Sequence, residues 1–60
     1  MTPASFIAWR ERLHLNRVEA SARLGLSRET LRFYETGKRR IPLYIALACA
    51  AVALGIKPHD

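Results

Sequence analysis

Apolar residues recur at helical spacing along the chain, in segments separated by polar residues, glycine and proline. In the first segment Phe6, Trp9 and Leu13 follow one another at intervals of three and four, which places them on one face of a helix. Pro3 is typical of a first helical position, because proline has no N–H to leave unpaired and its φ is already helical. The pattern predicts a helix over residues 3–13.

Two shorter helices are each bounded by a polar cap and a glycine. Asn16 and Glu19 have the spacing of a capping box, in which each side chain accepts from the other residue's backbone N–H. Ser27 is a cap of the same kind for the next helix. The glycines that end the helices, by adopting a left-handed conformation, are Gly25 and Gly37. These signals predict helices over residues 17–24 and 28–36, joined by a tight turn.

A basic loop, formed by Lys38, Arg39 and Arg40, precedes the last predicted helix. Pro42 opens that helix, which we expect over residues 42–54, before Gly55 and Pro58 end it. One face is expected to line the core through Leu43, Leu47, Ala50 and Leu54. The opposite face is apolar as well, and a surface helix of a small monomer is expected to have a polar back. We therefore expect a twofold homodimer whose interface is formed by Ile45, Ala48, Cys49 and Val52.

No strand pattern is found, so the sequence predicts an all-α, compact four-helix domain over residues 1–60. At 60 residues there is room for one domain only. We expect Lys57, His59 and Asp60 to form a frayed tail.

The charge balance indicates a polyanionic partner. Ten Lys and Arg against five Asp and Glu give a net charge of +5, which favours nucleic acid first and an anionic membrane second. Membrane binding is the weaker alternative, because the basic residues and the apolar excess lie in different segments. The N-terminus lacks the features of a secretory signal, and a single cysteine suits a reducing compartment, so we expect a cytoplasmic protein.

The sequence contains no pattern typical of a metal site or of a catalytic site. His14 and His59 stand far apart with no acidic cluster beside them, so no metal site is expected. No nucleophile, base and orienting group can be assembled, so we do not expect an enzyme. We expect no cofactor and no small-molecule ligand.

The helix over residues 28–36 has one face for the core and one for a ligand. Leu31 and Tyr34 point to one side at about 100° per residue, and Arg28, Glu29 and Arg32 spread over the other. A short helix that presents guanidinium groups and a carboxylate can enter the major groove of DNA, where Arg reads guanine and Glu reads cytosine.

With these segments in view, the chain resembles the lambda-repressor-like helix-turn-helix proteins, also called the XRE family, and especially their short phage repressors. The resemblance covers about residues 6–55. It is carried by the motifs Trp9-Arg10, Leu15-Asn16-Arg17-Val18-Glu19-Ala20, Leu24-Gly25-Leu26-Ser27 and Tyr34-Glu35-Thr36-Gly37-Lys38, with Pro42 before an apolar helix.

The resemblance implies a role for several residues. The base-contacting positions would be Arg28, Glu29, Arg32 and Phe33. The phosphate-contacting positions would be Asn16, Arg17, Thr30, Thr36, Lys38, Arg39 and Arg40. Phe33 has two interpretations of equal weight, contact with a thymine methyl group or cover for the edge of the core. The resemblance further implies a salt bridge between Arg10 and Glu35.

Two positions depart from the family pattern. His14 stands where glycine is frequent, so a left-handed turn there would cost some strain. Ser21 stands where an alanine usually packs the second helix onto the third.

The leading expectation is a sequence-specific DNA-binding transcription regulator of double-stranded DNA. The resemblance suggests an autoregulatory repressor that binds an inverted-repeat operator as a homodimer, in a phage or mobile-element operon. The alternative is a protein-interaction module, antitoxin-like or binding a host factor, that uses the apolar last helix.

Overall fold

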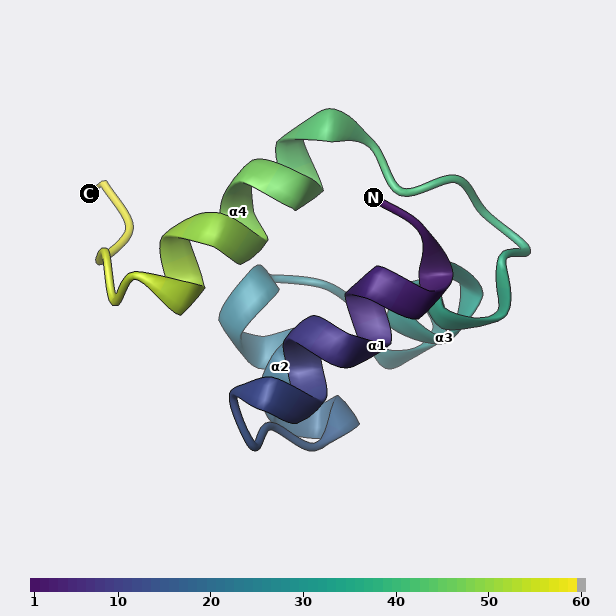
Figure 1. Ribbon diagram of the computed structural model, residues 1–60, viewed down its shortest axis with the longest axis horizontal. Helices are drawn as coiled ribbons and strands as arrows, with labels where there is room; N and C mark the ends of the chain where they lie inside the picture. The colour runs from purple at the N-terminus through teal and green to yellow at the C-terminus, as the bar shows by residue number, and fades with distance from the viewer. Residues whose placement is uncertain (60) are drawn as a thin grey trace.

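Four helices form the protein in the computed structural model, which describes residues 1–59 (Figure 1). They are α1 (Pro3–Arg12), α2 (Arg17–Leu24), α3 (Arg28–Thr36) and α4 (Leu43–Ala53). Within residues 1–59 there is no strand, and the predicted all-α, four-helix fold is confirmed. The expectation of a frayed tail at Asp60 falls outside the described residues.

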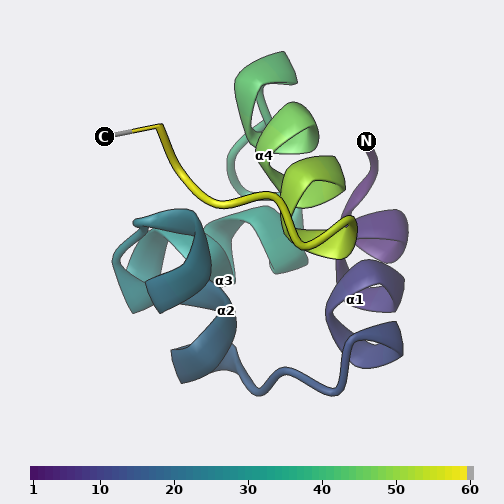
Figure 2. The same ribbon diagram turned by 90° about the vertical axis from the view of Figure 1, so that its left-hand side faces the viewer.

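The helices surround one apolar core. α1 and α2 both pack against α3, and α2 also packs against α4. Figure 2 shows α4 above, with α1 on one side and the α2–α3 pair on the other. The buried apolar residues come from all four helices and the loop before α4: Phe6, Trp9, Ala20, Leu31, Tyr34, Ile41, Ile45 and Cys49. Phe6 lies at the centre, stacked on Trp9 and edge-on to Tyr34, with ring centroids 5.6 and 6.0 Å away.

The sequence signals at the helix ends operate as predicted. Asn16 Oδ1 accepts from the N–H of Glu19 at 2.7 Å, and Glu19 Oε1 accepts from the N–H of Asn16 at 2.9 Å. Gly25 and Gly37 end α2 and α3 with φ of 68° and 79°, in the left-handed region that glycine enters at little cost. The two outer helices are slightly shorter than predicted, and Pro42 occupies the N-cap position before α4 rather than its first helical position.

His14 adopts the expected left-handed conformation, with φ of 57°. Its N–H donates to the carbonyl of Glu11 and the N–H of Leu15 donates to that of Arg10, which closes the end of α1. Ser21 leaves no buried polar group unsatisfied, because its hydroxyl donates to the carbonyl of Val18 at 2.9 Å. Neither departure from the family pattern disturbs the fold.

The expected orientation of α4 is wrong. Ile45 and Cys49 are buried, and Ala48 and Val52 lie half-buried on the same side, so the four residues assigned to a dimer interface face the core. The residues expected to line the core are exposed instead: Leu43, Leu47, Ala50 and Leu54.

The physical reason is that α4 has no polar face. From Leu43 to Ala53 it contains only apolar residues and Tyr44, so its periodicity does not indicate which side turns inward. Tertiary contacts decide the rotation. Trp9 Nε1 donates to the carbonyl of Cys49 at 2.8 Å, and the β-branched Ile45 and Val52 pack with Cys49 against the other helices.

Candidate nucleic-acid interface

α3 is anchored on one side and open on the other. Leu31 is fully buried and Tyr34 is nearly so, whereas Arg28, Glu29 and Arg32 are exposed. The helix starts firmly, because Ser27 Oγ accepts from the N–H of Thr30 at 3.1 Å. The exposed charges therefore project from a helix whose rotation is set by the core.

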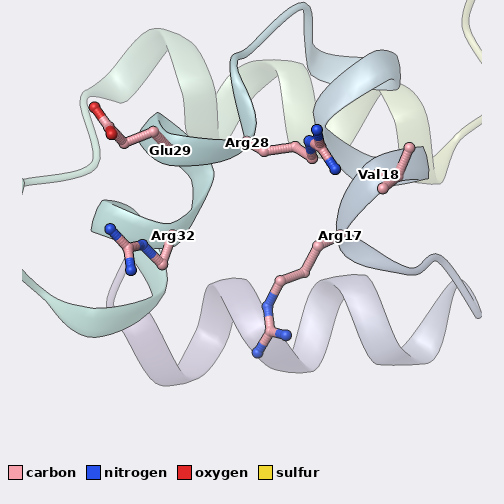
Figure 3. Close-up of a pocket in the computed structure, with 5 residues that line it drawn as sticks. All are labelled: Arg17, Val18, Arg28, Glu29 and Arg32. Carbon is pink, nitrogen blue, oxygen red and sulfur yellow. The ribbon is translucent and has the colours of Figure 1, made fainter.

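A shallow hollow lies between the exposed face of α3 and the start of α2. It has a volume of about 470 Å³ and is lined by Arg17, Val18, Arg28, Glu29 and Arg32. Figure 3 shows Arg28 pointing toward α2, where Val18 lies, and Arg32 pointing the opposite way. Arg17 reaches down toward α1. The hollow thus combines guanidinium donors, one carboxylate and one apolar side chain, which are the groups that read base edges and thymine methyls.

Glu35 connects the three helices that build this face. Its carboxylate accepts from Arg10 Nε of α1 at 2.7 Å and from Arg17 Nε of α2 at 3.0 Å. Arg10 also donates to the carbonyl of Leu15, in the loop before α2. The salt bridge implied between Arg10 and Glu35 is therefore present, and Arg17 adds a second ion pair that the sequence did not indicate.

The two ion pairs differ in exposure. The side chains of Arg10 and Glu35 are 13% and 4% exposed, whereas that of Arg17 is 64% exposed. Water screens the ion pair of Arg17 with Glu35, whereas the pair of Arg10 with Glu35 is largely shielded from water. Arg10 and Glu35 hold α1 to α3, and Arg17 keeps much of its guanidinium surface open to an anion.

Phe33 lies under the basic loop. Its half-buried ring has Lys38 Nζ at 4.8 Å, Arg39 Cζ at 5.4 Å and Arg32 Cζ at 5.8 Å from the centroid. All three distances fall within the range of a cation–π contact. This placement brings the predicted phosphate-contacting residues Lys38 and Arg39 beside the predicted base-contacting residues Arg32 and Phe33.

The remaining predicted phosphate contacts are distributed around this face. Asn16 is exposed, with its side-chain oxygen already engaged in capping α2. Thr30 is half-buried beside Ser27, and the hydroxyl of Thr36 donates to the carbonyl of Phe33 at 3.4 Å. Arg40 is exposed at the end of the loop.

One lining residue was missed from the sequence. Val18 is 55% exposed between the arginines of the hollow. Its position in α2 could have identified it, because Val18 lies two residues before the buried Ala20 and therefore on the opposite side of the helix.

Two groups on the core side of the molecule have shifted pKa values. Burial raises the pKa of Tyr34, Tyr44 raises it further, and Arg39 partly offsets both. Burial raises the pKa of the Cys49 thiol to about 11. Among residues 1–59, no group of three or more His, Cys, Asp or Glu residues could hold a metal ion. Across the same residues, no helix is both long and apolar enough to cross a membrane.

The comparison with known families agrees with this geometry. A family model described as helix-turn-helix matches residues 7–58, which is most of the chain. No curated protein and no solved structure matches the chain significantly.

Proposed function

The chain belongs to the lambda-repressor-like helix-turn-helix family of DNA-binding transcription regulators, and from this premise we propose that it is a repressor that binds an inverted-repeat operator as a homodimer. The observation that supports the proposal most directly is the open face of α3, where Arg28, Glu29 and Arg32 project from a helix anchored by its buried side.

The size of α3 suits the major groove. An α-helix is about 10–12 Å across with its side chains, and the major groove of B-DNA is about 12 Å wide, so the nine-residue α3 can lie within it. We assign Arg28 and Glu29, at the start of α3, to base edges, with Arg32 one turn further on. A bidentate Arg–guanine contact discriminates against the wrong base by about 1–3 kcal/mol.

Phosphate contacts would fix the register of α3 in the groove. We assign them to polar and basic residues at the start of α2, on α3 and in the following loop: Asn16, Arg17, Thr30, Thr36, Lys38, Arg39 and Arg40. The N-terminus of α2 also carries the partial positive charge of a helix dipole. A dimer that neutralises about eight phosphates would bind with a log–log salt slope of about −7.

The proposed dimer uses the exposed side of α4. Leu43, Leu47 and Leu54 are 75%, 62% and 76% exposed and share one side of the helix with the small Ala50. No charged residue occurs between Leu43 and Ala53, so two copies of a strongly basic chain could meet there without opposing like charges. A twofold axis would place two α3 helices roughly 34 Å apart, one turn of DNA.

The test begins with the mass of the protein in solution and the selection of bound duplexes from a random DNA library. The proposal expects a dimer, an enriched inverted repeat, and tighter binding to that repeat than to random duplex at two salt concentrations. A chain that enriches no sequence and binds neither DNA contradicts it. An autoregulatory repressor should also find such a repeat overlapping the promoter of its own reading frame.

A second candidate function rests on the same exposed side of α4. Leu43, Tyr44 and Leu47 could dock a different protein, as in an antitoxin-like module. A monomer that ignores both DNAs would favour this alternative, whereas a dimer that binds the selected repeat would exclude it as the main activity.

A further inference from the structure

We propose that Phe33 is a positioning residue that gathers the cations of α3 and the basic loop into one preformed site for a DNA phosphodiester. This inference rests on the proposed DNA-binding function and assigns Phe33 to the DNA backbone rather than to a thymine methyl. It also places Arg32 at the edge of the phosphate site.

The side chain of Phe33 supplies the first argument. Lys38 Nζ lies 4.8 Å from the ring centroid and the guanidinium of Arg39 lies 5.4 Å from it, with Arg32 at 5.8 Å. A ring face attracts cations through its quadrupole. Three long, exposed basic side chains therefore share one rigid, half-buried support.

The backbone of Phe33 supplies the second argument. Its carbonyl accepts from the N–H of Arg39 at 3.2 Å and from the hydroxyl of Thr36 at 3.4 Å. Gly37 allows this return, because its φ of 79° turns the chain back over the end of α3. The ring thus contacts the cations of the loop, and the carbonyl of the same residue holds the loop backbone at Arg39.

The charge pattern identifies the ligand class. Three cations around one ring repel one another, and no carboxylate in the described residues forms an ion pair with Arg32, Lys38 or Arg39. An anion with several oxygen acceptors would relieve the repulsion and accept from several donors at once. The neighbouring face of α3 points to a phosphodiester of duplex DNA as that anion.

The experiment compares wild type with Phe33→Leu and Phe33→Tyr over a range of salt concentrations, on a random-sequence duplex and on the selected operator. Each duplex is about 20 base pairs long, which spans two turns of DNA. Phe33→Leu keeps an apolar side chain and removes the ring, whereas Phe33→Tyr keeps the ring. We expect Phe33→Leu to weaken binding about three- to tenfold at low salt. The salt slope should fall by about 0.9 for each phosphate that is no longer neutralised. Phe33→Tyr should behave like wild type.

A spectroscopic readout keeps the inference testable without DNA. The ring should shift the NMR resonances of the Lys38 side-chain methylenes, and Phe33→Leu should abolish that shift while the melting temperature reports on the fold. Unshifted Lys38 resonances in the wild type would overturn the inference. So would a weakening by Phe33→Leu that is confined to one DNA sequence with an unchanged salt slope, which would assign Phe33 to a base. A wild type that binds no duplex but shows the ring shift would instead count against the proposed function.

Discussion

The carboxylate of Glu35 links α3 to α1 and α2 through two ion pairs. Its carboxylate is nearly buried and accepts from Arg10 and Arg17, so the ion pairs help to set the angles at which α1, α2 and α3 meet. The contribution of each pair depends on its exposure, because water screens the Arg17 pair far more than the Arg10 pair. Glu35 is therefore structural, although it belongs to the helix that we propose enters DNA.

Replacement of Glu35 by Gln should lower the free energy of unfolding by about 2–3 kcal/mol, since it removes charge-assisted hydrogen bonds to two arginines. Arg17→Ala removes only the exposed pair and should cost under about 1 kcal/mol. Urea denaturation measures both. Equal decreases in the two variants would contradict this division.

Arg28 belongs to the same helix but has a different role. Arg28→Ala should leave the unfolding transition unchanged and weaken binding to the selected operator by about 1–3 kcal/mol per subunit, because it removes a guanidinium assigned to a base edge. Arg12→Ala is the matched control, since Arg12 is an exposed arginine on α1 outside the hollow. Operator affinity that falls equally in the two variants would refute the assigned base-reading face.

Cys49 predicts a pH dependence of stability. Its thiol pKa rises from an ordinary value of 9.0 to about 11 in the fold, so the folded state holds the proton more tightly than the unfolded chain. The stabilisation is complete below about pH 9 and is removed as the pH rises toward about 11. Tyr34, with its raised pKa, acts in the same direction. Cys49→Ala should flatten part of this alkaline decline in urea denaturation, and an unchanged decline would contradict the assignment.

At the scale of elements, the ends of the helices are the features that local chemistry controls best. Thr2, Asn16 and Ser27 each accept from a backbone N–H three residues on, and glycines close α2 and α3. The end of α1 is the exception, because His14 adopts a left-handed conformation that is unfavourable for a residue with a Cβ atom.

His14→Gly should therefore stabilise the protein. Relief of left-handed strain is worth about 1–2 kcal/mol, and the extra entropy of an unfolded glycine cancels about 0.5–1 kcal/mol of it. We expect a net gain of about 0.5–1 kcal/mol in urea denaturation. His14 is exposed, so its removal disturbs little packing. A decrease in stability would show that the imidazole makes a favourable contact.

At the scale of the whole molecule, α4 separates the core from the proposed dimer interface. Its inner side joins the core through Ile45 and Cys49, and the helix packs against α2. The carbonyl of Cys49 also accepts a hydrogen bond from Trp9 of α1. The outer side of the helix leaves Leu43 and Leu47 exposed. A single apolar helix can thus complete a small core and offer a surface to a second copy.

The two sides should respond differently to a carboxylate. Leu47→Asp should yield a folded monomer, because it places a charge in the proposed dimer interface. Val52→Asp should instead destabilise the fold by more than about 2 kcal/mol, because Val52 packs against the core. Sedimentation equilibrium gives the mass and circular dichroism the helicity. A Leu47→Asp variant that remains dimeric would rule out this interface.

Features that depend on near neighbours in the chain follow from the order of the residues alone. Caps, glycine stops and the alternation of Leu31 and Tyr34 with charged residues are local, so the four helices and the open face of α3 could be derived from it. The salt bridge of Arg10 and Glu35 came from the family resemblance, since nothing local brings residues so far apart together.

Three features could not be derived in this way: the rotation of α4, the second partner of Glu35 and the support of the basic loop by Phe33. For α4 the reason is that an all-apolar helix has no periodicity to orient it, so packing against Trp9 and the neighbouring helices selects the buried side. The Glu35 contacts depend on how α1, α2 and α3 meet, and that geometry is set by the core. The Phe33 contacts depend on the path of the chain after Gly37, which returns Lys38 and Arg39 to the end of α3.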